Sequence, residues 1–168
     1  KYNLVNIDTG ATYRCVTLEM MNQNIRMDEE EKIAEMLKSI QIELSTEKGK
    51  QKVFLNGQDV TDKIRSKEVS ANVSPVSSIK QVRLAMGGLQ RKMAQGKDVI
   101  MEGRDIGTVI FPNADVKIYL DANVEVRAKR RVKQNEEKGI EMSYEEVLEN
   151  IKKRDKNDME KEMGALKV

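Results

Sequence analysis

Residues 99–108 read Val-Ile-Met-Glu-Gly-Arg-Asp-Ile-Gly-Thr, an apolar run that changes abruptly into charged residues separated by glycines. A short apolar run between charged neighbours is typical of a buried strand. The glycines after it allow backbone conformations and close approaches that a Cβ would prevent. In open α/β sheets, ligands bind beyond the carboxyl ends of the strands, where Arg104 and Asp105 would lie. The stretch predicts a strand leading into a binding loop, although a surface turn with solvated charges would show the same pattern.

The amino-terminal stretch repeats this arrangement. Residues 4–7, Leu-Val-Asn-Ile, lead into residues 8–14, Asp-Thr-Gly-Ala-Thr-Tyr-Arg. A helix is predicted to follow, because side chains recur at helical spacing at Tyr13, Val16, Thr17, Met20 and Met21. We expect Arg14 in the first turn of this helix, beside the mouth that Arg104 would line.

A third informative stretch lies near the carboxyl terminus. Arg154, Asp158 and Lys161 follow one another at i, i+4 and i+7. This spacing places two positive groups and one acceptor on a single helical face, which suits a phosphate and a sugar hydroxyl. A solvated face of ion pairs is the alternative interpretation.

Together these stretches resemble one family, the bacterial cytidylate kinases, a branch of the nucleoside monophosphate kinases. Residues 8–14 resemble the family's Asp-Ser-Gly-Ala-x-Tyr-Arg, and residues 102–112 resemble its central Gly-Arg-Asp-(Ile/Met)-Gly-Thr loop. Arg154-Asp155 with Asp158 completes the order. The resemblance covers nearly the whole chain, and three motifs in the right order at matching intervals are hard to obtain by chance.

Composition agrees with this resemblance. The chain has 168 residues, enough for a compact domain with a real core, and its net charge of +2 does not favour nucleic acid as a partner. A single cysteine, Cys15, and the absence of histidine exclude a disulfide framework within the chain and the usual His/Cys metal sites. No apolar run approaches transmembrane length and no signal peptide is visible, so we expect a cytoplasmic protein that does not use a membrane. We also expect a monomer.

The first half of the chain predicts a helix followed by a small sheet. Asp28 is a good N-cap, and Glu31 is placed to complete a capping box. The apolar period then changes to two, at Ile40, Ile42 and Leu44 and again at Val53 and Leu55, on either side of a turn at residues 47–50. Asn56-Gly57 turns the chain once more toward Asp59-Val60. We predict an antiparallel sheet of up to three strands here.

The second half predicts further elements of the main domain. Residues 79–93 have the apolar spacing of a helix, weakened by Gly87-Gly88. Val116–Leu120 is predicted to be a second strand of the main sheet. Asn123 is expected to cap a basic helix, and residues 143–146 form a capping box that starts the helix carrying Arg154.

The resemblance implies an α/β fold of the P-loop nucleoside monophosphate kinase kind, with a parallel sheet flanked by helices in three layers and a small antiparallel β insertion. Residues 1–36 and 70–122 would belong to the core and residues 37–69 to the nucleotide-monophosphate-binding insertion. Residues 123–142 would form the lid, and residues 143–168 the carboxyl-terminal helical region of the core.

The implied reaction is phosphoryl transfer from ATP to CMP or dCMP. The implied ligands of the acceptor phosphate are Arg14, Arg104 and Arg154; of the base, Ser74, Arg83 and Asp105; of the sugar, Asp158; and of the transferring phosphoryl group, Arg127, Arg130 and Arg131. Thr9, Tyr13 and Lys161 complete the substrate site, with Tyr13 packing against the base. An Arg and a Ser can donate to cytosine O2 and N3, while a carboxylate accepts from its amine. Mg²⁺ is implied with ATP, held by phosphates and water, and we predict no metal-ligating side chain.

The basic helix containing Arg127 to Lys133 also has other interpretations, a solvated face or a nucleic-acid patch. Nucleic acid is disfavoured by Glu136-Glu137 directly after it and by an aromatic content of 4%, which leaves little for base stacking. An RNA-binding protein would show strongly salt-dependent affinity for oligonucleotides and none for mononucleotides.

Three departures from the family pattern stand out. Lys161 replaces the usual Arg, and a Lys cannot make the same bidentate phosphate contact, whereas Thr9 in place of Ser keeps the hydroxyl. The 168 residues contain no Gly-x-x-x-x-Gly-Lys-(Ser/Thr). One alternative is a non-catalytic nucleotide-binding or regulatory module that has lost its ATP site. We expect instead that a phosphate-binding loop precedes Lys1, that a strand and helix follow Val168, and that this segment alone is poorly soluble and inactive.

Overall fold

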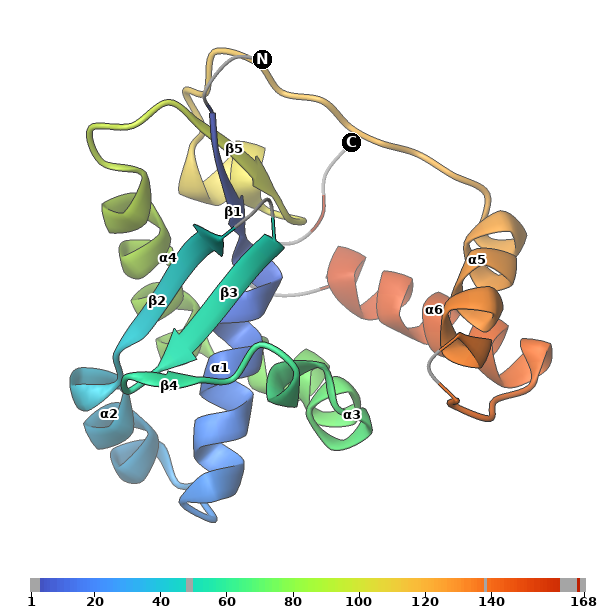
Figure 1. Ribbon diagram of the computed structural model, residues 1–168, viewed down its shortest axis with the longest axis horizontal. Helices are drawn as coiled ribbons and strands as arrows, with labels where there is room; N and C mark the ends of the chain where they lie inside the picture. Colours follow the sequence, from blue (N-terminus) through green and yellow to red (C-terminus); the bar gives the residue numbers. More distant parts are fainter. Residues whose placement is uncertain (1–3, 48–49, 138, 161–165, 167–168) are drawn as a thin grey trace. The chain divides into compact units, whose positions relative to one another are not determined.

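The computed structural model describes residues 4–47, 50–137, 139–160 and 166. The chain divides into two compact units, Lys1–Pro112 and Asn113–Val168. The first unit contains both sheets and the helices that pack on them, and the second contains a pair of helices (Figure 1). The predicted fold class is confirmed, because a parallel sheet with flanking helices is accompanied by a small antiparallel sheet.

The parallel sheet pairs the two strands predicted from the motifs. β1 (Val5–Asp8) lies beside β5 (Val99–Glu102), with Val5 opposite Val99 and Asp8 opposite Glu102. Because the strands are parallel and in register, both polar segments begin at the same edge of the sheet. The two motifs therefore begin side by side.

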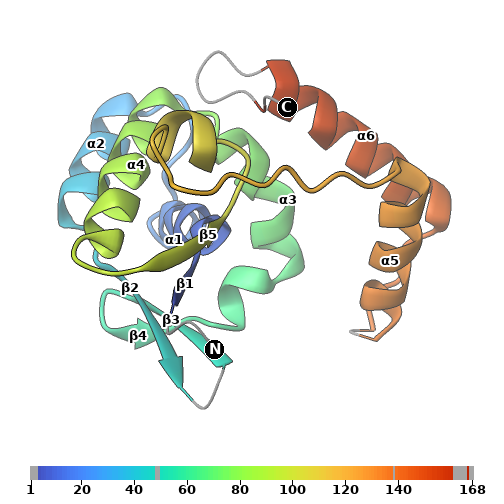
Figure 2. The same ribbon diagram turned by 90° about the horizontal axis from the view of Figure 1, so that it is seen from above.

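Helix α1 (Thr9–Asn22) is the central helix of the first unit. Asp8 caps it, with its Oδ1 accepting from the Ala11 amide at 3.2 Å, so the helix begins directly after β1 and Arg14 lies in its second turn rather than its first. Around α1 pack α2 (Glu30–Ser39), α3 (Lys67–Val76) and α4 (Lys80–Ala94) (Figure 2).

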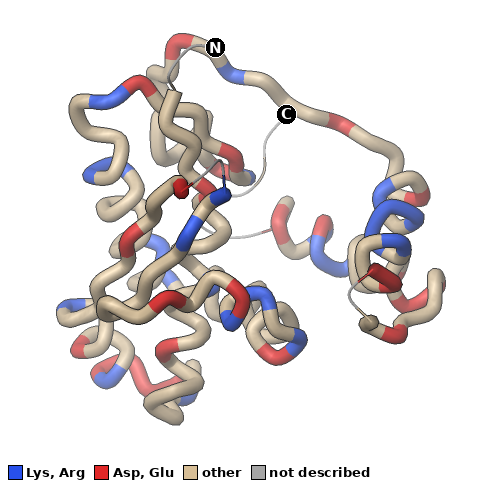
Figure 3. Tube along the Cα trace, in the orientation of Figure 1, with Lys and Arg blue, Asp and Glu red and all other residues tan. Residues whose placement is uncertain are grey.

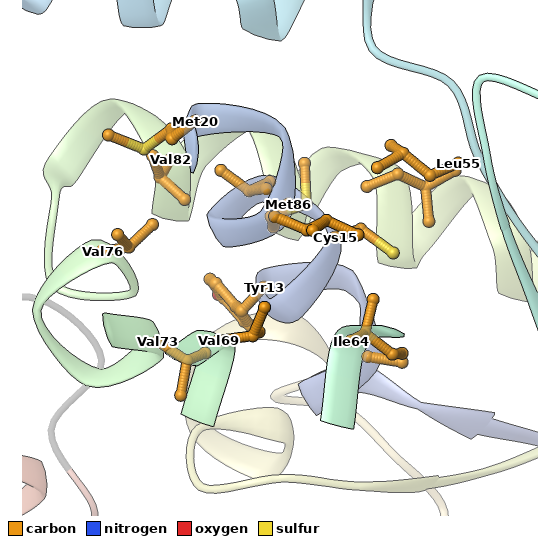
Figure 4. Packing of buried hydrophobic residues seen from close by; sticks show 14 of the residues in the cluster. Tyr13, Cys15, Met20, Leu55, Ile64, Val69, Val73, Val76, Val82 and Met86 are labelled. Carbon is orange, nitrogen blue, oxygen red and sulfur yellow. The ribbon is translucent and has the colours of Figure 1, made fainter. Parts of the chain in front are cut away.

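The core of the first unit is built around the buried face of α1. Figure 4 shows Tyr13 beside Val69 and Val73 of α3, with Cys15 beside Met86 of α4. Because α1 follows β1 without an intervening loop, this packing also fixes the edge of the sheet where the polar segments begin.

The antiparallel sheet consists of β2 (Ile42–Glu47), β3 (Lys50–Leu55) and β4 (Gln58–Asp59), in that order. Asn56 and Gly57 have φ values of +50° and +79°, the left-handed conformation that an Asn-Gly turn supplies. The predicted hairpins are confirmed, while the central residues of the 47–50 turn lie outside the described residues. A short 3₁₀ turn, η1 (Lys63–Arg65), then connects the sheet to α3.

The predicted start of α2 is wrong. The helix begins at Glu30, and Asp28 makes no capping bond because it accepts a hydrogen bond from Arg26 Nε at 3.0 Å. Glu29 Oε2 accepts from the Arg26 amide at 2.8 Å. Arg26 therefore occupies the carboxylates that would otherwise cap the helix.

Both helix caps predicted for the second unit are confirmed. Asn123 Oδ1 accepts from the Glu125 amide at 2.8 Å and starts α5 (Val124–Glu136), the basic helix visible in Figure 3. Ser143 and Glu146 form a reciprocal capping box at 3.2 and 2.8 Å, which starts α6 (Tyr144–Glu160).

The predicted strand at residues 116–120 is not formed. Val116, Ile118 and Leu120 are 75%, 83% and 91% exposed, and the segment has no regular structure. A strand needs a neighbour that pairs with its backbone, and within the described ranges the parallel sheet consists of β1 and β5.

In the part of the chain that the structure describes, no helix is long and apolar enough to cross a bilayer.

Cys15 provides a probe of the fold. Burial, with a contribution from the nearby Asp8 charge, raises the pKa of its thiol to about 12, and its side chain is fully buried. We expect iodoacetamide at pH 8 to leave Cys15 unmodified in the native protein and to label it quantitatively in urea, because the thiolate is the reactive form. Mass spectrometry of both samples measures this, and rapid labelling of the native protein would contradict the packing around α1.

Candidate active site

Where β1 and β5 end, the start of α1 and the loop after β5 are held close together. Thr9 Oγ1 donates to the carbonyl oxygen of Glu102 at 2.7 Å, which joins the start of α1 to the end of β5. A Cβ on Gly103 would lie 2.6 Å from Thr9 Oγ1 and 2.8 Å from Ile106 Cγ1. Only glycine therefore allows the loop to pass so close to Thr9.

The loop after Gly103 exposes one charged residue and buries the next. Arg104 is exposed, whereas Asp105 is buried and directly precedes a single π-helical turn, η2 (Ile106–Ile110). The Ile106 carbonyl accepts from the Phe111 amide at 2.7 Å and the Asp105 carbonyl from the Ile110 amide at 3.3 Å, the i→i+5 bonds of this turn. π-helical turns are frequent at functional sites, because they redirect side chains within a few residues.

Asp105 forms a buried ion pair with Arg83 of α4. Arg83 Nη2 donates to Asp105 Oδ2, the two side chains are 6% and 9% exposed, and Arg83 Nη1 donates to the Ser77 carbonyl at 3.0 Å. The Tyr13 ring centroid lies 5.7 Å from Arg83 Cζ, within cation–π range. Since buried charges are tolerated only when paired, each partner fixes the other.

Tyr13 and Arg83 also carry buried polar atoms without a protein partner. Among the described residues, the Tyr13 hydroxyl and Arg83 Nε make no hydrogen bond. Burial raises the pKa of Tyr13, Arg83 opposes the rise and Asp105 adds to it, so the hydroxyl stays protonated and can donate. Buried atoms of this kind mark places where a ligand or water completes the bonding.

Arg14 is held by groups that the sequence did not single out. Its Nη1 donates to the Ile64 carbonyl and to Ser70 Oγ, both at 2.9 Å. Ser70 lies one helical turn before Ser74 in α3, and this i, i+4 spacing was the signal that could have identified it. Ser74 itself is half-buried, and its carbonyl accepts from Ser77 Oγ at 2.8 Å.

A second buried polar chain supports the start of α1. Gln90 Nε2 of α4 donates to Thr12 Oγ1 at 3.0 Å, and Thr12 Oγ1 donates to the Thr9 carbonyl at 2.8 Å. Thr9 is thus tied to α4 through its carbonyl and to β5 through its hydroxyl. No local pattern predicts these hydrogen bonds, because Gln90 and Thr12 are 78 positions apart in sequence.

The second unit carries the remaining predicted residues. Arg127 Nη1 and Nη2 donate to the two Asp155 oxygens at 3.0 and 2.7 Å, Nε donates to the Ala122 carbonyl at 2.9 Å, and hydrogen bonding to Asp155 raises the pKa of Arg127. The remaining arginines, Arg130, Arg131 and Arg154, are exposed.

Asp158 is 2% exposed, and its carbonyl accepts from the Leu166 amide at 2.8 Å. Lys161 lies outside the described residues. The structure brings Tyr13, Arg83 and Asp105 into contact, joins Thr9 to the end of β5 and ties Arg14 to η1 and α3. Ser74 and Arg104 also lie in the first unit, and the other predicted residues belong to the second.

The Arg127–Asp155 pair predicts a measurable coupling between α5 and α6. We expect a double-mutant cycle with Arg127→Gln and Asp155→Asn to give an interaction energy of about 1 kcal/mol, since the pair is bidentate but one-third exposed. Urea denaturation of the four proteins measures it. Additive single effects would show that the pair does not hold the two helices together.

Comparison with known sequences agrees with the resemblance found in the sequence motifs. The family model described as "Cytidylate kinase" matches residues 1–168. The chain is 47% identical to a cytidylate kinase of Caldicellulosiruptor saccharolyticus over 168 residues, covering 100% of this chain and 74% of that protein. It is 47% identical to a cytidylate kinase of Bacillus subtilis over 167 residues, covering 99% and 75%. A cytidylate kinase of Fusobacterium nucleatum is 46% identical, with the same coverage.

Proposed function

Because the chain belongs to the cytidylate kinase family, we propose that it transfers the terminal phosphoryl group of ATP to CMP or dCMP, giving CDP or dCDP and ADP. The observation that best supports the choice of base is the buried Arg83–Asp105 pair beside Tyr13. It places a fixed donor and a fixed acceptor next to an aromatic ring.

This pair matches the hydrogen-bonding pattern of cytosine. Arg83 and Ser74 would donate to O2 and N3, and the Asp105 carboxylate would accept from the exocyclic amine, with Tyr13 packing against the ring. Uracil carries a carbonyl where cytosine has the amine, so it would meet Asp105 acceptor to acceptor. The pair therefore favours cytosine over uracil.

The charges of the reaction explain the number of arginines proposed. Joining a nucleoside monophosphate to ATP brings two polyanions together, so the protein must neutralise oxygens, align donor and acceptor and exclude water. Arg14, Arg104 and Arg154 would hold the acceptor phosphate, with Thr9 at the same edge. No covalent nucleophile is needed.

The second unit would contribute the residues that bind the sugar and the transferring phosphoryl group. Asp158 would accept from a sugar hydroxyl and Lys161 would add a positive charge, while Arg130 and Arg131 would contact the transferring phosphoryl group. Arg127 belongs to the same set, and engaging a phosphate would require it to release Asp155. ATP would bind as its magnesium complex, with Mg²⁺ held by phosphates and water to neutralise their charge.

We propose a role for each segment of the chain in this reaction. Residues 37–69 would form the insertion that binds the monophosphate, residues 123–142 the lid, and the remainder the core. We propose that the enzyme acts as a cytoplasmic monomer on free nucleotides, with no nucleic-acid or membrane partner.

The experiment is a coupled ADP-release assay on the full-length protein with CMP, dCMP and UMP as acceptors, together with calorimetry for CMP and for ATP. CMP-dependent ADP release well above that with UMP supports the proposal. Binding of CMP without binding of ATP would instead indicate a non-catalytic nucleotide-binding module.

A further inference from the structure

Arg65, the last residue of η1, lies beside the beginning of α1. Its Nη2 is 3.8 Å from Asp8 Oδ2, and its Nη1 donates to the Thr61 carbonyl at 2.8 Å. Ile64, the residue before it, is fully buried in the core, which anchors η1 against the first unit. Because Asp8 caps α1, the Arg65 guanidinium is held at the edge of the sheet where Thr9 begins the helix.

Arg14 contacts the peptide group that precedes Arg65. Arg14 Nη1 donates to the Ile64 carbonyl, and this carbonyl belongs to the peptide that links Ile64 to Arg65. Arg14 thus reaches η1 from α1, while Arg65 reaches the N-cap of α1 from η1. Both positive side chains therefore lie along the first two turns of α1.

The contact between Arg65 and Asp8 is weak in geometry. At 3.8 Å it is too long for a hydrogen bond, and the two side chains are 40% and 30% exposed. Asp8 Oδ1 is engaged by the Ala11 amide. An exposed ion pair of this kind contributes little to stability, so Arg65 can exchange Asp8 for a stronger acceptor. A phosphate with two negative charges offers bidentate, charge-assisted hydrogen bonds to a guanidinium.

We infer that Arg65 is a further ligand of the acceptor phosphate, leaving Asp8 for CMP when the nucleotide binds; this inference rests on the proposed function. The hydrogen bond from Nη1 to the Thr61 carbonyl would hold one side of the guanidinium in place while Nη2 leaves Asp8. Since Arg65 lies in the proposed insertion, residues 37–69, its contact with phosphate would join the insertion to the bound acceptor.

Calorimetry on the full-length protein tests this with CMP and ATP as separate ligands. We expect Arg65→Gln to raise the CMP dissociation constant about ten- to hundredfold and to leave the ATP constant unchanged, because one charge-assisted contact is lost. Arg65→Lys keeps the charge without the planar fork and should lie between Gln and wild type. The matched control is Arg26→Gln, which removes an exposed arginine whose partner is Asp28; both constants should stay at their wild-type values.

The outcomes separate the inference from the proposed function. An Arg65→Gln constant for CMP within about twofold of wild type would overturn the role of Arg65 alone. Equal losses of CMP and ATP affinity in both Arg65 variants, with lower unfolding midpoints, would also overturn it, because they assign Arg65 a structural role. A wild-type protein that binds no CMP would overturn the proposed function as well.

Discussion

Replacing Asp105 by asparagine is expected to lower the free energy of unfolding by about 3 kcal/mol and to reduce the preference for CMP over UMP. The loss of stability follows because Arg83 would keep a buried positive charge without a counter-charge. The change in preference follows because an amide can donate to uracil O4, which a carboxylate cannot do. Urea denaturation and kcat/KM for both acceptors measure the two effects.

Two further variants identify the cause of the expected loss of stability. Asp28→Asn makes the same chemical change in the exposed Arg26–Asp28 pair and should leave the unfolding transition unchanged within error. Adding Arg83→Met to Asp105→Asn removes the stranded charge, so the double variant should be more stable than Asp105→Asn alone. A double variant no more stable than the single one would show that the buried charge is not responsible. An unchanged acceptor preference would remove Asp105 from base recognition.

The elements predicted correctly from the sequence are those whose signals are local. Asn56-Gly57 consists of two residues that tolerate positive φ, and Asn123 and the Ser143–Glu146 box satisfy backbone amides within three residues. Such interactions need no distant partner. The pattern of residues 8–14 predicts the helix correctly but its start too late, because Asp8 is an N-cap and the polar residues that follow it are already helical.

The failures depended on partners that the local pattern did not contain. Asp28 has the composition of an N-cap, yet Arg26 competes for it, and the competition depends on side-chain geometry. The segment 116–120 has the alternation of a strand, but strand formation depends on a neighbouring backbone. Its exposed apolar side chains show that alternation indicates the capacity to pair rather than pairing itself.

Residues of the candidate site could be predicted from the sequence where they belong to a motif. Residues that reach the site through packing could not. The motif of residues 102–108 singled out Arg104 and Asp105, but it gave no indication that Asp105 would be buried against Arg83. Ser70, Gln90 and Arg65 belong to no motif, and their contacts join α1 to segments 50 or more positions away in sequence. Such contacts follow from how α1 packs, which only the folded chain reveals.

The largest kinetic effect is expected for Gly103→Ala. The new Cβ would meet Thr9 Oγ1 at 2.6 Å and Ile106 Cγ1 at 2.8 Å, closer than real Cβ contacts allow. Thr9 is short and hydrogen-bonded to Glu102, so it cannot move aside, and the loop backbone must shift instead. Arg104 and Asp105 follow directly, and a displacement of about 1 Å at reacting groups costs on the order of a hundredfold in rate. We therefore expect kcat/KM for CMP to fall about a hundredfold, measured in the coupled assay.

Gly88→Ala is the matched control, because a Cβ there meets nothing within 4 Å and the residue lies within α4. It should keep full activity and increase stability by about 0.4–1 kcal/mol, since alanine restricts the unfolded chain. Thr9→Ala combined with Gly103→Ala removes the nearer of the two side chains that the new methyl group meets. If crowding at Thr9 displaces the loop, the double variant will be more active than the product of the two single effects predicts. Strict multiplicativity would instead show that the loop moves for another reason, and that the Thr9–Glu102 bond does not determine where Arg104 and Asp105 lie.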